Sequence, residues 1–458
     1  MSDLSRMLNI AKSALLANRY ALDVTSNNIA NAHTDGYSRQ RPELETSPSV
    51  QTPFGYLGSG VEMRRVIRIR DAFVDQEIRS STNSLGENQV YNKVLDEVEA
   101  YFNEPNGGGL STEFDNFFKA FQELANNPED IGVRETVLQQ GISISKVFNE
   151  IASGLDTIRF DALKKVNDTL QDINNLTSEI ASLNKQIFSL GSTDVNELMD
   201  IRDKRIDELS KLIDVKVIID SNGLANVSSG GSTLVSGVNS LKIVSDSNSN
   251  YIQLLYEGTK TALGSISGTL GGYVNTFNTL IPKYQQKFDT LASTFINEVN
   301  KLHSSGYGLP DLTTGEASTG INFFEGTDAR SIKLTNDVKN NVRNIAASVD
   351  GSSGNNLVAQ KISKLLDKGI FDNGNTTFTQ FYRGIITAIG YENSDSSRKA
   401  TSYESRVSSL ENLKSSISGV SLDDEMVNLI KYQRSFEAAA KVVQSVDELF
   451  DTLLSLKR

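Results

Sequence analysis

The sequence predicts a mainly α-helical fold with a smaller β-rich domain, in an elongated multi-domain chain whose N- and C-terminal helices pair as a coiled coil. Apolar residues near both ends recur at alternating steps of four and three residues, which is the spacing of a coiled-coil seam. Only 7 of the 458 residues are proline and 38% are apolar, so long helices are favoured. Short alternating segments between residues 215 and 255 are instead typical of β-strands.

The N-terminal segment predicts one long helix over residues 1–32, followed by an extended stretch. Its seam comprises Leu4, Leu8, Ala11, Leu15, Asn18, Leu22, Thr25, Ile29 and Ala32. Asn27, Asn28 and Asn31 crowd the helix end, where asparagine tolerates left-handed geometry, and Asp35-Gly36 indicates a turn. Prolines at 42, 48 and 53 exclude a helix over residues 38–70.

Two groups of charged residues stand out in the first half of the chain. Arg64, Arg65, Arg68 and Arg70 end the extended stretch, where apolar and basic residues partly alternate. We expect these arginines on a solvated strand face, with a contact to an acidic neighbouring subunit as the alternative. Asp200, Asp203 and Asp207 share one face of a predicted helix. Because basic residues intervene, we expect a solvated ion-pair helix there rather than a cation site.

The middle of the chain predicts helices, then strands, then helix and loops. The expected helices cover residues 72–103, 112–127 with Ser111 as N-cap, 132–190, 196–213 and 270–302. A further seam between Val166 and Ile187 predicts a coiled-coil-like partner. Residues 306–356 are rich in Gly, Ser, Thr and Asn, so we expect loops over a small surface subdomain. Short helices are expected at 357–369 and 377–390, and a longer one at 399–417.

Ser421 is expected to cap a last helix, whose acidic first turn suits the helix dipole. Its predicted seam is Leu422, Met426, Leu429, Gln433, Phe436, Ala440, Val443, Asp447, Phe450 and Leu454. A second stripe, Val442, Val446, Leu449 and Leu453, lies beside it. A stripe this wide requires more than one partner helix. The terminal helices are therefore expected to assemble with neighbouring subunits. If the chain runs out and back like a hairpin, the β-rich domain should lie far from both termini.

These elements group into four expected domains. They are a terminal helical assembly domain (1–35 and 415–458), a helical rod domain (36–195, 268–305 and 396–414), a β-rich outer domain (196–267) and an irregular small insertion subdomain (306–395).

Composition and motifs point away from catalysis and from several classes of ligand. The net charge of −12 disfavours nucleic acid and anionic membrane surfaces, and the absence of cysteine excludes disulfides and thiolate metal sites. The two histidines, His33 and His303, match no catalytic motif. A calcium-loop-like run from Asp246 has Tyr251 where the loop requires glycine. We expect no catalytic residue, no metal site and no cofactor. The sequence also shows neither a cleavable signal peptide nor an apolar run long enough to span a membrane.

One segment carries a resemblance to a known family. The run from Thr25 to Gln40 resembles the N-terminal signature of bacterial flagellar rod, hook and hook-associated proteins. Its ending, Tyr37-Ser38-Arg39-Gln40, resembles the hook-associated protein 1 family, the hook–filament junction proteins. Segments at 60–79, 117–134, 196–210, 267–306 and 418–438 are similar to that family as well. Glu197 departs from the family's usual aspartate, and residues 306–395 match poorly beyond Phe323-Phe324.

The resemblance implies an elongated axial protein that acts as a structural adaptor between hook and filament. It implies export through the flagellar type III apparatus without a cleaved signal, and an extracellular location on the flagellum. The implied partners are further copies in a ring, the hook protein, the next hook-associated protein and an export chaperone. Another axial role, of hook or filament type, is one alternative. An enzyme displayed on this scaffold, such as a glycan hydrolase with paired carboxylates, is another.

The resemblance also implies which residues serve assembly. The implied assembly interface is Leu4, Leu8, Leu15, Leu22, Asn27, Asn28, Ile29, Asn31, Gly36, Tyr37, Leu422, Met426, Leu429, Tyr432, Phe436, Val443, Phe450 and Leu454. The chaperone is expected to cover Phe436, Val443 and Leu449 before secretion.

Overall fold

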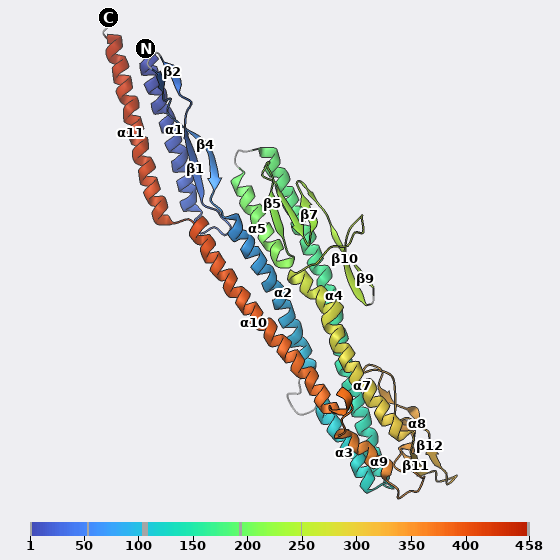
Figure 1. The fold of residues 1–458 in the computed structure, drawn as a ribbon. Helices are drawn as coiled ribbons and strands as arrows, with labels where there is room; N and C mark the ends of the chain where they lie inside the picture. The colour runs from blue at the N-terminus through green and yellow to red at the C-terminus, as the bar shows by residue number, and fades with distance from the viewer. Residues whose placement is uncertain (1, 53–54, 103–108, 192–194, 249, 456–458) are drawn as a thin grey trace.

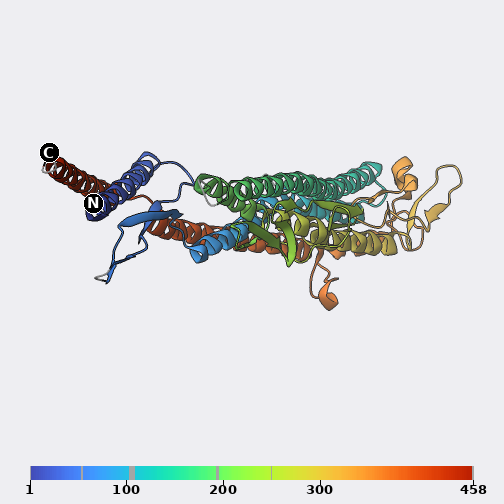
Figure 2. The same cartoon turned by 90° about the horizontal axis from the view of Figure 1, so that it is seen from above.

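The computed structural model describes residues 2–52, 55–102, 109–191, 195–248 and 250–455 of an elongated, mainly helical chain (Figure 1). The chain runs out and back, so that both termini lie at one end. Helix α1 (Ser2–Ala30) packs along α11 (Leu422–Ser455), and α2 (Ala72–Phe102) packs along α10 (Phe378–Ser418). The predicted fold class and the pairing of the terminal helices are therefore confirmed. Figure 2 shows that the terminal helix pair extends beyond one end of the rod.

The remaining helices build the rod. They are α3 (Leu110–Asn126), α4 (Ile131–Leu190), α5 (Asn196–Leu212), α6 (Gly268–Asn275), the π-helical turn η1 (Thr276–Leu280), α7 (Ile281–His303), α8 (Asn336–Asn340) and α9 (Leu357–Ser363). Short 3₁₀ turns lie at Val342–Asn344, Lys364–Leu366 and Asp372–Gly374. Helix α3 begins earlier than predicted, with Gly109 rather than Ser111 at its N-cap.

The strands form small antiparallel sheets. Their bounds are β1 (Gln40–Thr46), β2 (Val50–Thr52), β3 (Gly55–Leu57), β4 (Val61–Arg68), β5 (Lys216–Ile219), β6 (Ala225–Ser229), β7 (Ser232–Ser236), β8 (Asn239–Ser240), β9 (Ile243–Asn248), β10 (Tyr251–Tyr256), β11 (Tyr307–Pro310), β12 (Ala317–Thr319), β13 (Phe324–Glu325) and β14 (Lys333–Leu334). Strands β5 to β8 form a four-stranded sheet in sequence order, and the others pair as β1-β4, β2-β3, β9-β10, β11-β12 and β13-β14.

The sequence predicted that the β-rich segment lies at the end of the molecule far from both termini. The structure does not place it there. Its apolar residues share one core with α4 and α5, including Val227 and Leu234 from the sheet and Ile206 from α5. Strands β7, β8 and β9 contact α4 directly. The far end is instead formed by α3, α8, α9 and β11–β12 (Figure 1). The prediction failed because the sheet needs a helical surface to cover its apolar face.

Residues 306–356 are not simply loops on a surface. Phe323, Phe324, Ile332 and Val338 from this segment are buried in the larger core of the molecule, together with α3, α4 and α7. Helix α10 also runs unbroken through the predicted gap between residues 390 and 399. Asn393 donates to Asp96 and accepts from Asn92, both on α2, so packing between the two helices holds this stretch helical. The four-domain division remains a prediction.

Phenylalanine rings dominate the larger core, and Phe295 on α7 lies at their centre. Its ring centroid is 5.2–6.0 Å from the centroids of six other phenylalanine rings: Phe114, Phe117, Phe118, Phe148, Phe324 and Phe378. These rings come from α3, α4, β13 and α10, so one side chain joins segments that are distant in sequence.

Replacing Phe295 with alanine is expected to lower the free energy of unfolding by about 3–5 kcal/mol, because a fully buried ring leaves a cavity. Urea unfolding of the purified chain measures this change. The control is Phe160→Ala on the exposed face of α4, which should cost less than about 0.5 kcal/mol. Equal losses for the two variants would contradict the central position assigned to Phe295.

A buried histidine makes the stability of the rod depend on pH. His303 at the end of α7 donates from Nδ1 to the carbonyl oxygen of Ile321 at 2.7 Å. Its Nε2 accepts the backbone N–H of Ala346 at 2.9 Å, so the ring is neutral in this geometry. Burial lowers the pKa of His303 to about 4.

The unfolded chain, in which this histidine has its ordinary pKa, binds more protons than the folded chain between about pH 6.5 and pH 4. Stability should therefore fall as the pH drops through that window, by about 3 kcal/mol in total from this group. Urea unfolding at a series of pH values measures the slope. His303→Gln should flatten it, and His33→Gln, at an exposed position, should leave it unchanged. A slope that survives His303→Gln would assign the effect to other groups.

Candidate functional site

The terminal helix pair, α1 and α11, forms the first part of the candidate site. Helix α1 contacts α11 and also strands β1 and β4. The predicted leucines Leu4, Leu8, Leu15 and Leu22 and the predicted Ile29 are all half-buried. Between them lie buried small residues, among them Ala11, Ala17 and Ala21. The structure thus brings the predicted seam of α1 into contact with neighbouring elements along its length.

Only half of the predicted α11 seam is covered. The side of α11 with the most buried residues comprises Glu425, Leu429, Tyr432, Phe436, Ala439, Val443, Val446 and Phe450, again at steps of four and three. Leu422, Met426 and Leu454, predicted for the same seam, are exposed instead. The predicted seam and the covered side share Leu429, Phe436, Val443 and Phe450, and the exposed residues of the predicted seam remain a prediction for contacts with neighbouring subunits. A buried glutamate heads the covered side.

The helix pair leaves an apolar surface uncovered, which we call the outer stripe. Its members on α11 are Leu422, Met426, Val427, Ile430, Val442, Leu449, Leu453 and Leu454. Met7, Leu16 and Tyr20 on α1 are exposed as well. Proteins that act as monomers rarely expose so many large apolar side chains on one helix pair, so the outer stripe indicates a surface that another chain covers.

A set of hydrogen bonds anchors the base of the helix pair. The Asn28 side chain donates to Glu425 Oε2 at 3.1 Å and to the Gln40 carbonyl at 2.8 Å. Its oxygen accepts from the Tyr37 hydroxyl at 2.8 Å and from the Gln40 N–H at 2.9 Å. Glu425 is only 2% exposed and accepts two further bonds from Arg39, at 2.7 and 2.8 Å. One carboxylate thus joins α11 to the turn after α1.

The remaining predicted polar residues lie at the edge of this anchor. Asn31 donates to the Asn27 side chain at 2.7 Å on the exposed side of the helix end. Gly36 has a φ of +84°, which a side chain would strain. Burial, with Asp200 and Glu425 nearby, raises the pKa of Tyr37 to about 12, so its hydroxyl remains a donor. The predictions missed Glu425 and Arg39 as partners because a charge in a first helical turn is usually solvated.

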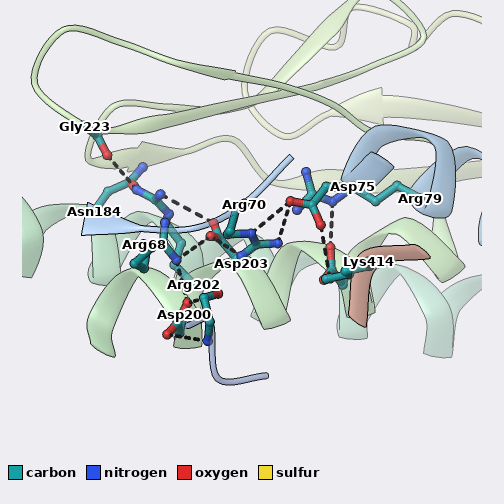
Figure 3. A network of polar contacts seen from close by, with 12 residues as sticks. Arg68, Arg70, Asp75, Arg79, Asn184, Asp200, Arg202, Asp203, Gly223 and Lys414 are labelled. Carbon is teal, nitrogen blue, oxygen red and sulfur yellow. Dashed lines mark hydrogen bonds and ion pairs between the residues drawn. The ribbon is translucent and has the colours of Figure 1, made fainter. Parts of the chain in front are cut away.

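Beneath the anchor lies a second set of contacts, the ionic joint, which connects the turn to the rod (Figure 3). The Ser38 hydroxyl donates to Asp200 at 2.7 Å. Arg68 at the end of β4 contacts both Asp200 and Asp203, at 2.7 and 2.8 Å. Arg70 contacts Asp203 and also Asp75 on α2. Segments from β4, α2 and α5 therefore share carboxylates.

The joint continues to α10. Lys414 contacts Asp75 at 3.1 Å and Asp207 at 3.5 Å, and Arg79 donates to Asp207 at 2.6 Å. Burial raises the pKa of Asp203, but Arg70 and Arg68 outweigh it, so that the pKa lies below its ordinary value. Asp203 therefore stays ionised at neutral pH although it is buried.

Two predictions about these charges were wrong. Arg68 and Arg70 are largely buried in contacts within the same chain, whereas Arg64 and Arg65 are exposed beside Glu45 and Glu43. Asp200 and Asp203 are buried rather than solvated. The aspartates do converge, but guanidinium groups occupy the space between them. Across the residues that the structure describes, no group of three or more His, Asp or Glu side chains could hold a metal ion.

Glu425→Gln should weaken the anchor by about 2 kcal/mol, because the hydrogen bonds to Arg39 lose a charged acceptor. Amide exchange should then be roughly 30-fold faster in residues 37–40 and in the first turns of α11. The matched control is Glu437→Gln, an exposed position on the same helix. Unchanged protection in the Glu425 variant would show that apolar packing alone holds the pair.

Comparisons with known proteins agree with this geometry. "Flagella basal body rod protein" matches residues 8–37, on α1 and the turn that follows it. "Flagellar basal body rod FlgEFG protein C-terminal" matches residues 415–456, on α11. "Flagellar hook-associated protein FlgK helical domain" matches residues 95–324, half of the chain. No helix among the described residues has the length and apolarity to cross a bilayer.

Full-length relatives carry the same name. Flagellar hook-associated protein 1 of Bacillus subtilis is 31% identical, over 98% of this chain and 97% of that protein. Its counterpart in Salmonella typhimurium is 24% identical, over 99% of this chain and 100% of that protein. The solved flagellar hook junction protein FlgK from Burkholderia pseudomallei has a similar fold, with a TM-score of 0.64 at 16% identity, over 75% of this chain and 100% of that one. The chain therefore belongs to the flagellar hook-associated protein 1 family, a family of structural axial components of the flagellum that are not enzymes.

Proposed function

We propose that this chain is a structural adaptor that joins the hook to the filament by packing its terminal helices between neighbouring subunits. The observation that carries the proposal is the outer stripe, an uncovered apolar surface on a helix that is anchored at its base. Covering one large apolar side chain contributes about 1.5–3 kcal/mol, so a few such contacts per neighbour suffice for assembly. No bond is made or broken in this role.

The proposal assigns residues 1–35 and 415–458 to assembly and the rest of the chain to the outer region of the structure. Further copies in a ring, the hook protein and the next hook-associated protein are the proposed axial partners. The proposed location is the extracellular flagellum, reached through the flagellar type III apparatus without a cleaved signal. Membership in the family supports these proposed partners and this proposed location.

An export chaperone is the remaining proposed partner, and the fold constrains how it binds. Phe436 and Val443 are half-buried on the side of α11 that α1 covers, whereas Leu449 is 48% exposed. A chaperone that covers all three must displace α1 from a stretch of α11. Chaperone binding and closure of the helix pair therefore exclude one another over this stretch.

Cells that lack the gene should carry bare hooks and release filament protein into the medium, as electron microscopy and immunoblotting would measure. Leu449→Asp should reproduce this defect, because a charge on the outer stripe opposes burial. The matched control, Ser445→Asp, adds the same charge at an exposed polar position one turn away and should restore filaments.

Recovery of the Leu449 variant from the medium separates failed assembly from failed export. Missing hooks in the deletion strain would place the chain lower in the axial structure. Normal filaments in that strain would refute the proposed function.

A further inference from the structure

A cavity of about 720 Å³ adjoins the ionic joint and is not used in the role proposed above. Its walls come from the end of β4, the first turns of α2, helix α5 and strand β5. Figure 3 shows several of the lining residues, with Arg68, Arg70 and Asp203 at the centre and Lys414 of α10 nearby. The cavity thus lies beside the segment that connects β4 to α2, next to the ionic joint.

Positive charge is in excess around this cavity. The cationic lining residues are Arg68, Arg70, Arg79, Arg202 and Lys216. The lining carboxylates are Asp75, Asp203 and Asp214. Asp214 is engaged by the Ser229 hydroxyl and the Gly230 N–H, at 2.8 and 3.1 Å. When the nearby members of the joint, Asp200, Asp207 and Lys414, are counted as well, the cations still outnumber the carboxylates by one.

Arg202 and Lys216 are the two cations of the cavity that carboxylates compensate least. Arg202 is 1% exposed and donates to the Asn184 side chain and the Gly223 carbonyl, at 3.2 and 2.7 Å. Its ion pair with Asp203 is long, at 3.5 Å, and its Nε has no hydrogen-bond partner among the described residues. Lys216 is exposed and makes no ion pair within the described segments of the chain. A buried cation whose ion pair is long is incompletely compensated, so an incoming carboxylate would be stabilised here.

The strand beside the cavity is also open. Within the described residues β5 pairs with β6 alone, so one edge of the four-stranded sheet is free. Ile218 and Ile219 on this edge are 59% and 51% exposed. Natural edge strands are usually protected by charges or covered by another element. Val217 and Ile219 line the cavity next to Lys216, so apolar and cationic groups face a ligand together.

We propose that this cavity receives an aspartate or glutamate side chain from an extended segment of a second copy of the chain. The proposal rests on the proposed function, since it requires terminal-helix packing to bring copies side by side at this level. The chain carries a net charge of −12, so a second copy offers abundant carboxylates to a cationic cavity. Each copy would then complete the ionic joint of its neighbour.

The test is photocrosslinking in motile cells of the native bacterium, with benzoylphenylalanine in place of Ile219. The expected product contains two copies of this chain, identified by mass spectrometry. Lys216→Glu in the same chain should lower the yield of that product about tenfold, because a like charge meets the incoming carboxylate. Lys185→Glu, the same change at an exposed position of α4, should leave the yield unchanged.

A crosslink from Ile219 to a different protein, the absence of any crosslink, or a yield insensitive to Lys216→Glu would each overturn the inference. A second strain with benzoylphenylalanine at Val427, on the outer stripe, separates this failure from failure of the proposed function. Crosslinks to axial proteins from Val427 without any from Ile219 would refute the inference alone. The absence of crosslinks from both positions would refute the proposed function.

Discussion

The direction of the terminal helix pair depends on carboxylates that are shared between segments. Asp203 on α5 is bonded to Arg68 and Arg70, which lie on either side of the transition from β4 to α2. Glu425 has the same role at the base of the helix pair, between α11 and the turn after α1. Removing one partner of a buried pair leaves an uncompensated charge, so the loss of one of these contacts destabilises the others. Ion pairs also have directions that apolar contacts lack, and a helix pair extending from the rod needs a fixed direction.

The chain divides its apolar residues between two purposes. In the rod, phenylalanine rings from distant segments meet around Phe295 and are fully buried. In the terminal pair, small alanines are buried on α1 whereas leucines and valines of α11 face outward. The phenylalanine core of the rod is therefore complete within one chain, whereas the apolar residues of the terminal pair are only partly covered. An axial protein has use for this division, because its body must be stable before assembly and its ends must still have surface to cover.

Local patterns predicted most of the helices, the terminal pairing and the strands between residues 215 and 256. They could not predict what depends on contacts between distant residues. The heptad of α1 was visible because every third or fourth residue is apolar, but the burial of Asp200 depends on Ser38 and Arg68, more than 130 positions away. Residues 306–356 lack periodicity, yet Phe323 and Phe324 are buried because α3 and α7 supply the surface that covers them. In the site, Asn28 and Tyr37 were found through a signature, and Glu425 was missed because charge alone does not reveal burial.

The position of the joint bears on how a neighbour's contact reaches the rod. Helix α11 joins α10 through residues 419–421, and the Ser418 carbonyl accepts the N–H of Arg39 at 3.1 Å. Lys414, one turn earlier on α10, contacts Asp75 and Asp207. A neighbour that packs on the outer stripe therefore acts on a helix whose base is held by Glu425 to α1 and the turn after it. The end of α10 next to it is held by Ser418 to the same turn and by Lys414 to α2 and α5. Movement of α11 relative to α10 as a rigid body requires the contacts of Glu425 with Asn28 and Arg39 to break, whereas bending within its later turns breaks none of them. Adaptation between unlike neighbours is therefore easiest toward the end of α11 that is farthest from the joint.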